Sequence, residues 1–235
     1  MNTPASCVEG LNPEQRAAVE TVDGPLLILA GAGSGKTRVL TQRVAYLLAT
    51  GVPAWQILAV TFTNKAAAEM KNRVREQVGE TANKVFVSTF HSACVRILRQ
   101  DIEPMGFKRN FTIYDMDDQK RLVKQLLKDN DIDPKVWSPR KVMGIIDQAK
   151  TKMQDAAAFK AERGVRANDP APRIFVAYEK HLQVANAVDF NDLLNHTVRL
   201  LQQHPAVLKR YQDRFRYIMV DEYQDTNLSQ YLLIK

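Results

Sequence analysis

The first ninety residues alternate short apolar runs with longer stretches in which apolar residues recur at helical spacing. The apolar runs have the length of buried β-strands and lie at residues 25–30, 57–62 and 84–89. The stretches of helical period lie at residues 37–50 and 66–78. Because strands that alternate with helices form parallel sheets, this part of the chain predicts an α/β domain.

One more helix is predicted ahead of the first strand. Asn12 is a favourable N-cap, and Pro13 suits the first helical position. Gln15 stands where a capping box places its glutamine, so the helix should begin at this point.

From about residue 115 to residue 211 the chain is helical in pattern. Helices are predicted over residues 117–129, after Ser138 and after Asp189, each with cap chemistry at its start. Residues 151–172 are polar and alanine-rich, with a glycine and two prolines, and predict a loop.

A strand-like run returns at residues 217–220, after the helical stretch. The simplest account is an α/β domain with a helical block inserted into it. We therefore predict a nucleotide-binding domain made of residues 1–90 and 215–235, and an all-helical insertion made of residues 91–214.

Composition narrows the class of protein. Hydrophobic residues make up 45% of the chain and charged residues 25%, as in ordinary soluble proteins. No apolar run approaches the roughly 20 residues that cross a bilayer, and the N-terminal residues do not have the pattern expected of a secretory signal. Cys7 and Cys94 lie far apart, without metal-ligand or redox spacing. We expect a cytoplasmic protein with reduced thiols and no membrane association.

The net charge of +7 is concentrated in the middle of the chain. Residues 91–215 carry 22 basic and 16 acidic side chains, so a polyanion would be attracted most strongly there. Solvated lysines on helix faces give the same count, and charge alone leaves nucleic-acid binding open.

The strongest chemical signal is the run Ala30-Gly31-Ala32-Gly33-Ser34-Gly35-Lys36-Thr37. It follows a predicted strand and opens a predicted helix, which is the context of a phosphate-binding P-loop. Glycines let backbone N–H groups converge on phosphate oxygens, and the helix N-terminus adds partial positive charge. Lys36 is expected to reach the β- and γ-phosphates, and Thr37 to bind Mg²⁺. The first position is Ala30, where the common pattern has glycine.

A second acidic element is needed to hold the metal. Residues 216–222 supply an apolar strand that ends in Asp221 and Glu222. Ligands gather at the carboxyl ends of parallel strands, so Asp221 is the natural partner of Mg²⁺ and Glu222 a general base for water. Taken alone, the same acidic pair could simply begin the next helix, because carboxylates suit a helix N-terminus.

With the P-loop, the run Asp221-Glu222-Tyr223-Gln224-Asp225-Thr226-Asn227 resembles the UvrD/Rep/PcrA family of superfamily 1 helicases. Gln15, ahead of the P-loop, is similar to the family glutamine that recognises adenine. Three further segments resemble family elements on the single-stranded DNA track: residues 61–70, 89–92 and 189–194.

The resemblance implies a RecA-like P-loop domain, an accessory helical domain, and ATP with Mg²⁺ as nucleotide and metal. It implies these catalytic residues: Lys36, Asp221, Glu222 and Gln224. It implies these ATP contacts: Gln15, Ala30, Gly31, Ala32, Gly33, Ser34, Gly35, Lys36, Thr37 and Arg38. It implies Thr37 and Asp221 as metal ligands. It implies these DNA contacts: Thr61, Phe62, Thr63, Asn64, Lys65, Thr89, Phe90 and His91.

Several of these residues have an alternative structural reading. Gln15 completes a capping box whether or not it contacts adenine, and Phe62 could belong to the core. Lys65 could be an ordinary surface side chain. His91 has no metal-ligand partner at useful spacing, so a zinc site is not expected.

The implied activity is ATP-driven 3′–5′ translocation on single-stranded DNA and unwinding at duplex junctions. The chain stops at Lys235 inside a Leu-Leu-Ile run, and the family continues with a second motor domain whose arginines reach the γ-phosphate. We therefore expect a fragment that binds ATP but hydrolyses it poorly. A RecB/AddA-type helicase–nuclease shares the motor motifs. A P-loop kinase shares the Gly35-Lys36-Thr37 element but does not explain residues 61–70 and 89–92.

Overall fold

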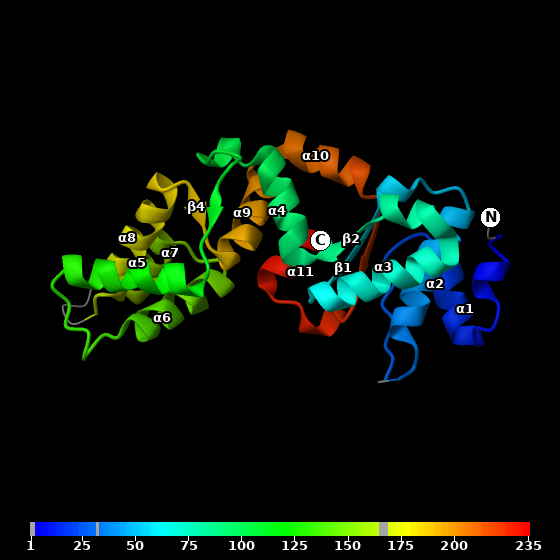
Figure 1. Ribbon diagram of the computed structural model, residues 1–235, viewed down its shortest axis with the longest axis horizontal. Helices are drawn as coiled ribbons and strands as arrows, with labels where there is room; N and C mark the ends of the chain where they lie inside the picture. Colours follow the sequence, from blue (N-terminus) through cyan, green and yellow to red (C-terminus); the bar gives the residue numbers. More distant parts are fainter. Residues whose placement is uncertain (1–2, 32, 165–168) are drawn as a thin grey trace. The chain divides into compact units, whose positions relative to one another are not determined.

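The computed structural model describes residues 3–31, 33–164 and 169–235 (Figure 1). The chain forms two compact units. The first consists of Met1–Ala93 and Lys209–Asp225, and the second of Cys94–Leu208 and Thr226–Lys235. The division into a nucleotide-binding domain and an inserted helical domain stays a prediction.

The first unit is built on a parallel sheet in the order β2-β1-β5. The strands are β1 (Ile57–Thr61), β2 (Phe86–Thr89) and β5 (Tyr217–Val220). All five residues of β1, the central strand, are buried, and Ile57 and Ala59 lie in a core shared with residues of helices that pack on the sheet. Val60 of β1 lies opposite Ser88 in β2 and Val220 in β5. The α/β class with a parallel sheet is therefore confirmed.

Helices accompany this sheet (Figure 1). The helical segments of the first unit are η1 (Ser6–Val8), α1 (Pro13–Glu20), α2 (Lys36–Ala49), η2 (Ala54–Gln56), α3 (Asn64–Val78), η3 (Gly79–Lys84) and η5 (Tyr223–Asp225). The capping box expected at Asn12 is present at the start of α1. The core between α2, α3 and the sheet contains Val44, Leu47, Ile57, Met70 and Val74.

The strand predicted at residues 25–30 is wrong. Within the part of the chain that the structure describes, these residues belong to no strand, and the side chains of residues 26–29 are exposed. Leu27 is 64% exposed and Leu29 is 87% exposed. A strand needs a neighbour for its backbone N–H and C=O groups, and an apolar run cannot specify that neighbour. The segment still leads directly into the P-loop.

The second unit is mainly helical. Its elements are η4 (Glu103–Met105), β3 (Thr112–Ile113), α5 (Met116–Asp129), α6 (Pro139–Thr151), α7 (Ala156–Arg163), α8 (Ala171–Val184), β4 (Ala187–Val188), α9 (Phe190–Gln203) and α11 (Leu228–Ile234). Two more helices, α4 (Phe90–Asp101) and α10 (Pro205–Arg214), contribute residues to both units. β3 and β4 form a short parallel pair. Val123, Val142, Ile174, Phe175 and Tyr178 lie in its core.

The loop predicted over residues 151–172 is also wrong in part. Asp155 caps α7 by accepting a hydrogen bond from the N–H of Ala158, and α8 begins at Ala171. Alanine-rich polar sequence forms a helix here because Phe159 packs into the core against Phe175. Across the described residues, no helix has the length and apolar character that spanning a membrane requires.

Candidate nucleotide and nucleic-acid site

The candidate site lies at the carboxyl ends of the three parallel strands. Thr61 ends β1, Thr89 ends β2, and Asp221 follows β5 directly. The backbone N–H of Asp221 donates a hydrogen bond to the carbonyl of Val60 at 3.0 Å, which extends the pairing of β5 with β1 by one residue. The strand pairing thus brings residues 61, 89 and 221 to one edge of the sheet.

The P-loop connects the exposed segment after Pro25 to α2. Gly33 and Gly35 have φ angles of 76° and 88°, a left-handed conformation that glycine adopts without steric cost. The Ser34 hydroxyl donates to the carbonyl of Gly31 at 2.6 Å, which closes the turn. Ala32, expected among the ATP contacts, lies outside the described residues.

The start of α2 suits an anion. Its N-cap is Gly35, and no side chain caps its first N–H groups, whereas Asn12 and Thr63 cap α1 and α3. A Cβ atom added at Gly31 or Gly33 would meet nothing within 4 Å, so the loop is open above these residues. Free N–H groups at a helix N-terminus bind phosphate, and the residues therefore fit a nucleotide.

Lys36 and Thr37, the first residues of α2, are half-buried. The Lys36 ammonium donates to the carbonyl of Ala30 at 3.2 Å, across the mouth of the loop. This bond keeps the lysine directed at the loop, where a phosphate oxygen can replace the carbonyl as its acceptor.

Gln15 binds the P-loop directly. Its side-chain carbonyl accepts from the N–H of Asn12, and its amide nitrogen donates to the carbonyl of Ser34 at 3.0 Å. Gln15 therefore takes part in the capping box of α1 and also lies beside the P-loop. Arg38 is exposed, and its guanidinium donates to the carbonyl of Gly10 at 3.2 Å, which directs it towards the N-terminal segment.

The two carboxylates after β5 have different surroundings. Asp221 is buried, and burial together with the charge of Glu222 raises the pKa of its carboxyl group. The positive charges of Lys36 and Arg73 act in the opposite direction. A carboxylate that burial destabilises gains the most from a nearby cation, so these electrostatics favour a metal ion. Arg73 belongs to no recognised motif, so its influence on Asp221 is not predictable from the sequence pattern.

Glu222 has a φ angle of 53°, which is unusual for a residue other than glycine. Its half-buried carboxylate accepts a hydrogen bond from the side-chain amide of Gln224 at 2.5 Å. The turn continues through a hydrogen bond from the N–H of Asp225 to the carbonyl of Glu222. Backbone turn and amide together orient the Glu222 carboxylate.

The residues expected on DNA divide into buried and accessible ones. The side chains of Thr61, Thr89 and Phe90 are buried, so they are not exposed for the DNA contacts that were expected from them. Phe90 packs against the half-buried Phe62, with ring centroids 5.5 Å apart. Phe62 thus packs partly against the core, in line with the alternative that it is a core residue.

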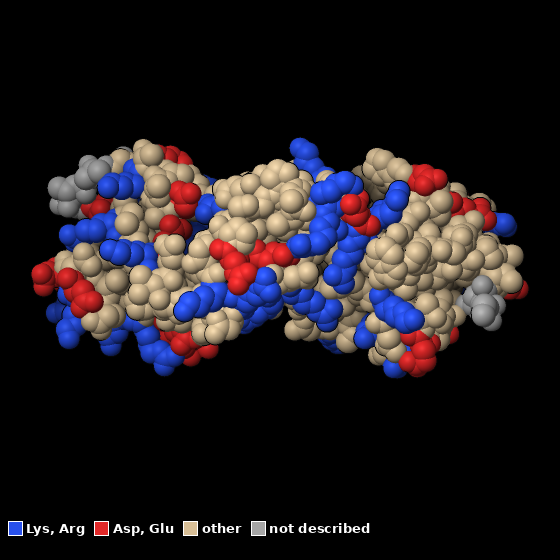
Figure 2. Space-filling model, turned by 90° about the horizontal axis from the view of Figure 1, so that it is seen from above, with Lys and Arg blue, Asp and Glu red and all other residues tan. Residues whose placement is uncertain are grey.

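Thr63, Asn64 and Lys65 are exposed at the start of α3, where the Thr63 hydroxyl accepts from the N–H of Ala66. His91 is half-buried, and burial lowers the pKa of its imidazole, which keeps it neutral at physiological pH. Figure 2 shows several groups of lysine and arginine side chains, separated by carboxylates, on the face that it presents. In the described part of the chain, no three His, Cys, Asp or Glu residues group as metal ligands.

Comparison with known proteins identifies relatives over nearly the whole chain. A family model described as the UvrD/REP helicase N-terminal domain matches residues 11–235. The chain is 49% identical to the ATP-dependent DNA helicase PcrA of Bacillus subtilis, over 97% of the chain and 31% of that protein. The identity to PcrA of Staphylococcus aureus is also 49%, and to PcrA of Staphylococcus epidermidis 48%. The chain thus spans about a third of the length of these curated relatives.

Proposed function

Because the chain belongs to the family of UvrD/REP helicase N-terminal domains, we propose that it is the ATP-binding part of an ATP-dependent DNA helicase. The observation that carries the proposal is a P-loop that is open at the start of α2 and lies together with a buried acid, Asp221. The positive charge of Lys36 lowers the pKa of that acid. A P-loop kinase would share the Gly35-Lys36-Thr37 element but not the match over residues 11–235. The relatives named above likewise give no support to a helicase–nuclease.

In this proposal the triphosphate of ATP lies against Gly31, Gly33 and the first N–H groups of α2. Lys36 exchanges the Ala30 carbonyl for a β- or γ-phosphate oxygen. Thr37 and Asp221 hold Mg²⁺, which neutralises charge on the phosphates. Glu222 orients and deprotonates the attacking water, while Gln224 fixes the Glu222 carboxylate.

Adenine recognition is assigned to Gln15. The Gln15 side chain already uses its carbonyl oxygen and its amide nitrogen within the protein. Its amide nitrogen has a second N–H and its carbonyl oxygen a second lone pair, so adenine can pair with this amide while the contact to Ser34 remains. Nucleotide binding and the shape of the P-loop are then linked through one side chain.

Single-stranded DNA is proposed to bind along the accessible residues at the carboxyl ends of the strands. Thr63, Asn64 and Lys65 offer polar groups to phosphates, and the half-buried Phe62 offers part of its ring to a base. For the whole protein, we propose 3′–5′ translocation on single-stranded DNA and unwinding of duplex junctions, driven by nucleotide-dependent closure against a second motor domain.

Titration of a fluorescent ATP analogue against the chain, with and without Mg²⁺, tests the nucleotide site. Lys36→Ala is expected to weaken binding at least tenfold, because the lysine contributes charge-assisted hydrogen bonds to phosphate. Lys71→Ala, an exposed lysine on α3, is the matched control and should leave the affinity unchanged. Equal affinities for the wild type and Lys36→Ala would remove the phosphate role from Lys36.

A further inference from the structure

A line of polar contacts joins α6 to α9 in the second unit. Asn191, Asn195 and Arg199 recur four residues apart on α9, which places them on one face of that helix. The contacts are Asn191 to the Asp147 carboxylate at 2.7 Å, Asn195 to the Lys150 carbonyl at 2.8 Å, and Arg199 to the Met153 carbonyl at 3.1 Å. These directional bonds set how the two helices align along their lengths.

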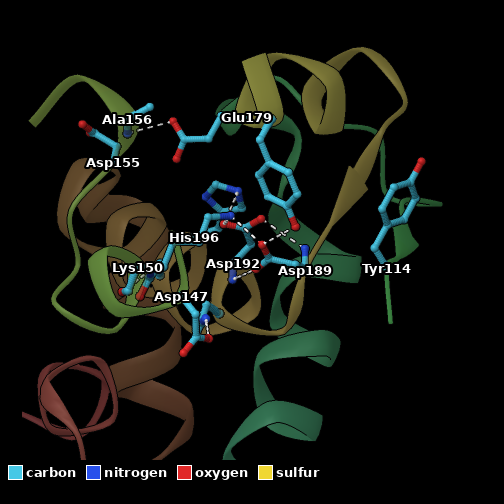
Figure 3. Close-up of polar contacts among 12 residues, drawn as sticks. Tyr114, Asp147, Lys150, Asp155, Ala156, Glu179, Asp189, Asp192 and His196 are labelled. Atoms are coloured by element: carbon cyan, nitrogen blue, oxygen red, sulfur yellow. Dashed lines mark hydrogen bonds and ion pairs between the residues drawn. The ribbon is translucent and has the colours of Figure 1, made fainter. Parts of the chain in front are cut away.

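The centre of this line is a buried lysine (Figure 3). The Lys150 side chain is 2% exposed, and its ammonium lies 2.7 Å from carboxylate oxygens of both Asp189 and Asp192. The Tyr178 hydroxyl donates to the same Asp189 oxygen at 3.0 Å. One cation is therefore enclosed by two carboxylates and a hydroxyl, contributed by α6, α8 and the start of α9.

Lys150 is charged in this cluster. Burial alone would lower its pKa, but the charges and hydrogen bonds of Asp192 and Asp189 raise it above the ordinary value. Asp192 is subject to the same burial, and the charge of Lys150 holds its pKa below the ordinary value. Burial and the charge of Asp192 raise the pKa of Asp189.

Both carboxylates also build the first turn of α9. Asp189 is its N-cap and accepts from the N–H of Asp192, while Asp192 accepts from the N–H of Asp189. Phe190, the first residue of the helix, is 52% exposed although its two acidic neighbours are buried. The buried Lys150 thus stabilises the turn that carries the exposed Phe190.

We propose that Lys150 is a positioning residue for nucleic-acid binding: by pairing with Asp189 and Asp192 it fixes the first turn of α9, so that the Phe190 ring meets a base of a single strand. The proposal rests on the single-stranded DNA binding proposed above. Lys150 is itself too buried to contact DNA, so its effect must pass through this turn. The two acids of the segment 189–194 then have a structural task, and Phe190 performs the contact.

A double-mutant cycle on DNA affinity tests the coupling. Phe190→Ala is introduced into the wild type and into the neutral variant Lys150→Met/Asp189→Asn/Asp192→Asn, and binding of oligo-dT is measured. Asparagine caps helices as well as aspartate does, so α9 should still form in the neutral variant. Replacing a buried ion pair with neutral groups is often tolerated, and thermal unfolding reports whether the variant is folded.

In the wild type, Phe190→Ala is expected to weaken binding about 5- to 150-fold, the range for one base stacked on an aromatic ring. In the neutral variant the same change should cost less than about threefold, because the ring is no longer held in place. Lys152→Met removes an exposed positive charge close to Lys150 and is the control that should preserve the full loss.

If the neutral variant does not fold, the cost of Phe190→Ala on oligo-dT affinity is measured instead in the Asp192→Asn background. In that background Lys150 and Asp189 remain as a one-to-one ion pair. A reduced cost of Phe190→Ala in either background supports the proposal. An equal cost in the wild type and in every folded variant overturns it, while DNA binding by the wild type keeps the proposed function. Absence of oligo-dT binding by the wild type overturns both this proposal and the single-stranded DNA site proposed above, while the nucleotide site is tested separately by the ATP-analogue titration.

Discussion

Replacing Lys150 with methionine is predicted to destabilise the second unit strongly. Methionine matches the length of the aliphatic stem of lysine but leaves Asp189 and Asp192 buried and facing each other without a cation. Removing one partner of a buried ion pair costs about 3–5 kcal/mol of unfolding free energy. For a unit of this size, that corresponds to a fall in melting temperature of about 10–20 °C.

The pH dependence gives this prediction its distinctive sign. In the wild type, Lys150 keeps the pKa of Asp192 low, so this carboxylate stabilises the fold above its ordinary pKa of 3.8 and loses that effect as the pH falls. Without the lysine, burial and their mutual repulsion raise the pKa values of both Asp189 and Asp192. The folded state then binds more protons than the unfolded state. The deficit of Lys150→Met should therefore shrink between pH 8 and pH 5, by up to about 1.4 kcal/mol per pH unit for each additional proton.

Urea unfolding followed by circular dichroism at several pH values measures both quantities. The positive charge of Lys150 also lowers the pKa of Glu179 and of His196, so its removal raises both and adds protons to the folded state in the same direction as the two aspartates. The Tyr178 hydroxyl, whose pKa burial raises above its ordinary value of 10.0, stays protonated throughout this pH range. Lys152→Met should unfold like the wild type at each pH. A deficit below about 1 kcal/mol, or one that stays constant from pH 8 to pH 5, would refute the assignment of Lys150 as the buried counter-ion.

Two further predictions concern the nucleic-acid and catalytic residues. Affinity for single-stranded DNA should fall steeply with salt because bound phosphates release counterions, and Phe62→Ala should weaken it by about 1–3 kcal/mol, as titrations at several salt concentrations will show. If Phe62→Ala lowers the melting temperature but keeps the affinity, Phe62 is a core residue only. With saturating single-stranded DNA, ATP turnover by the 235-residue chain should stay far below the median enzyme rate of about 10 s⁻¹, because the cations proposed to face the γ-phosphate come from a second motor domain. Turnover near that rate, abolished by Glu222→Gln, would show that the chain is a complete catalyst.

Local patterns predicted most of the elements correctly. The caps at Asn12, Ser138 and Asp189 each begin the helix that the sequence indicated, because a cap depends only on residues within one turn. The apolar runs predicted at residues 57–62 and 217–220 contain β1 and β5, and these two strands pair with each other. The run at 25–30 did not, because pairing depends on a neighbouring strand that no local pattern reveals.

The parts of the candidate site that depend on short sequence motifs could be predicted. The glycines of the P-loop and the acids after a strand are legible in sequence, since their spacing carries the chemistry. The influence of Arg73 on Asp221 and the enclosure of Lys150 by Asp189 and Asp192 are not, because these contacts join residues far apart in the chain. The burial of Phe90 was missed because an aromatic residue after a strand suits either the core or a DNA contact.

The most direct test of the nucleotide site is a crystal structure of the chain with a non-hydrolysable ATP analogue and Mn²⁺ in place of Mg²⁺. The anomalous signal of the metal should lie beside the β- and γ-phosphates, at a distance from the Thr37 hydroxyl oxygen close to the ~2.0–2.1 Å typical of Mg²⁺–oxygen bonds. Asp221 should bind the metal directly or through one water, and the Lys36 ammonium should contact phosphate. A triphosphate bound away from residues 30–37, or a metal beyond the reach of one water from Asp221, would contradict the proposed function.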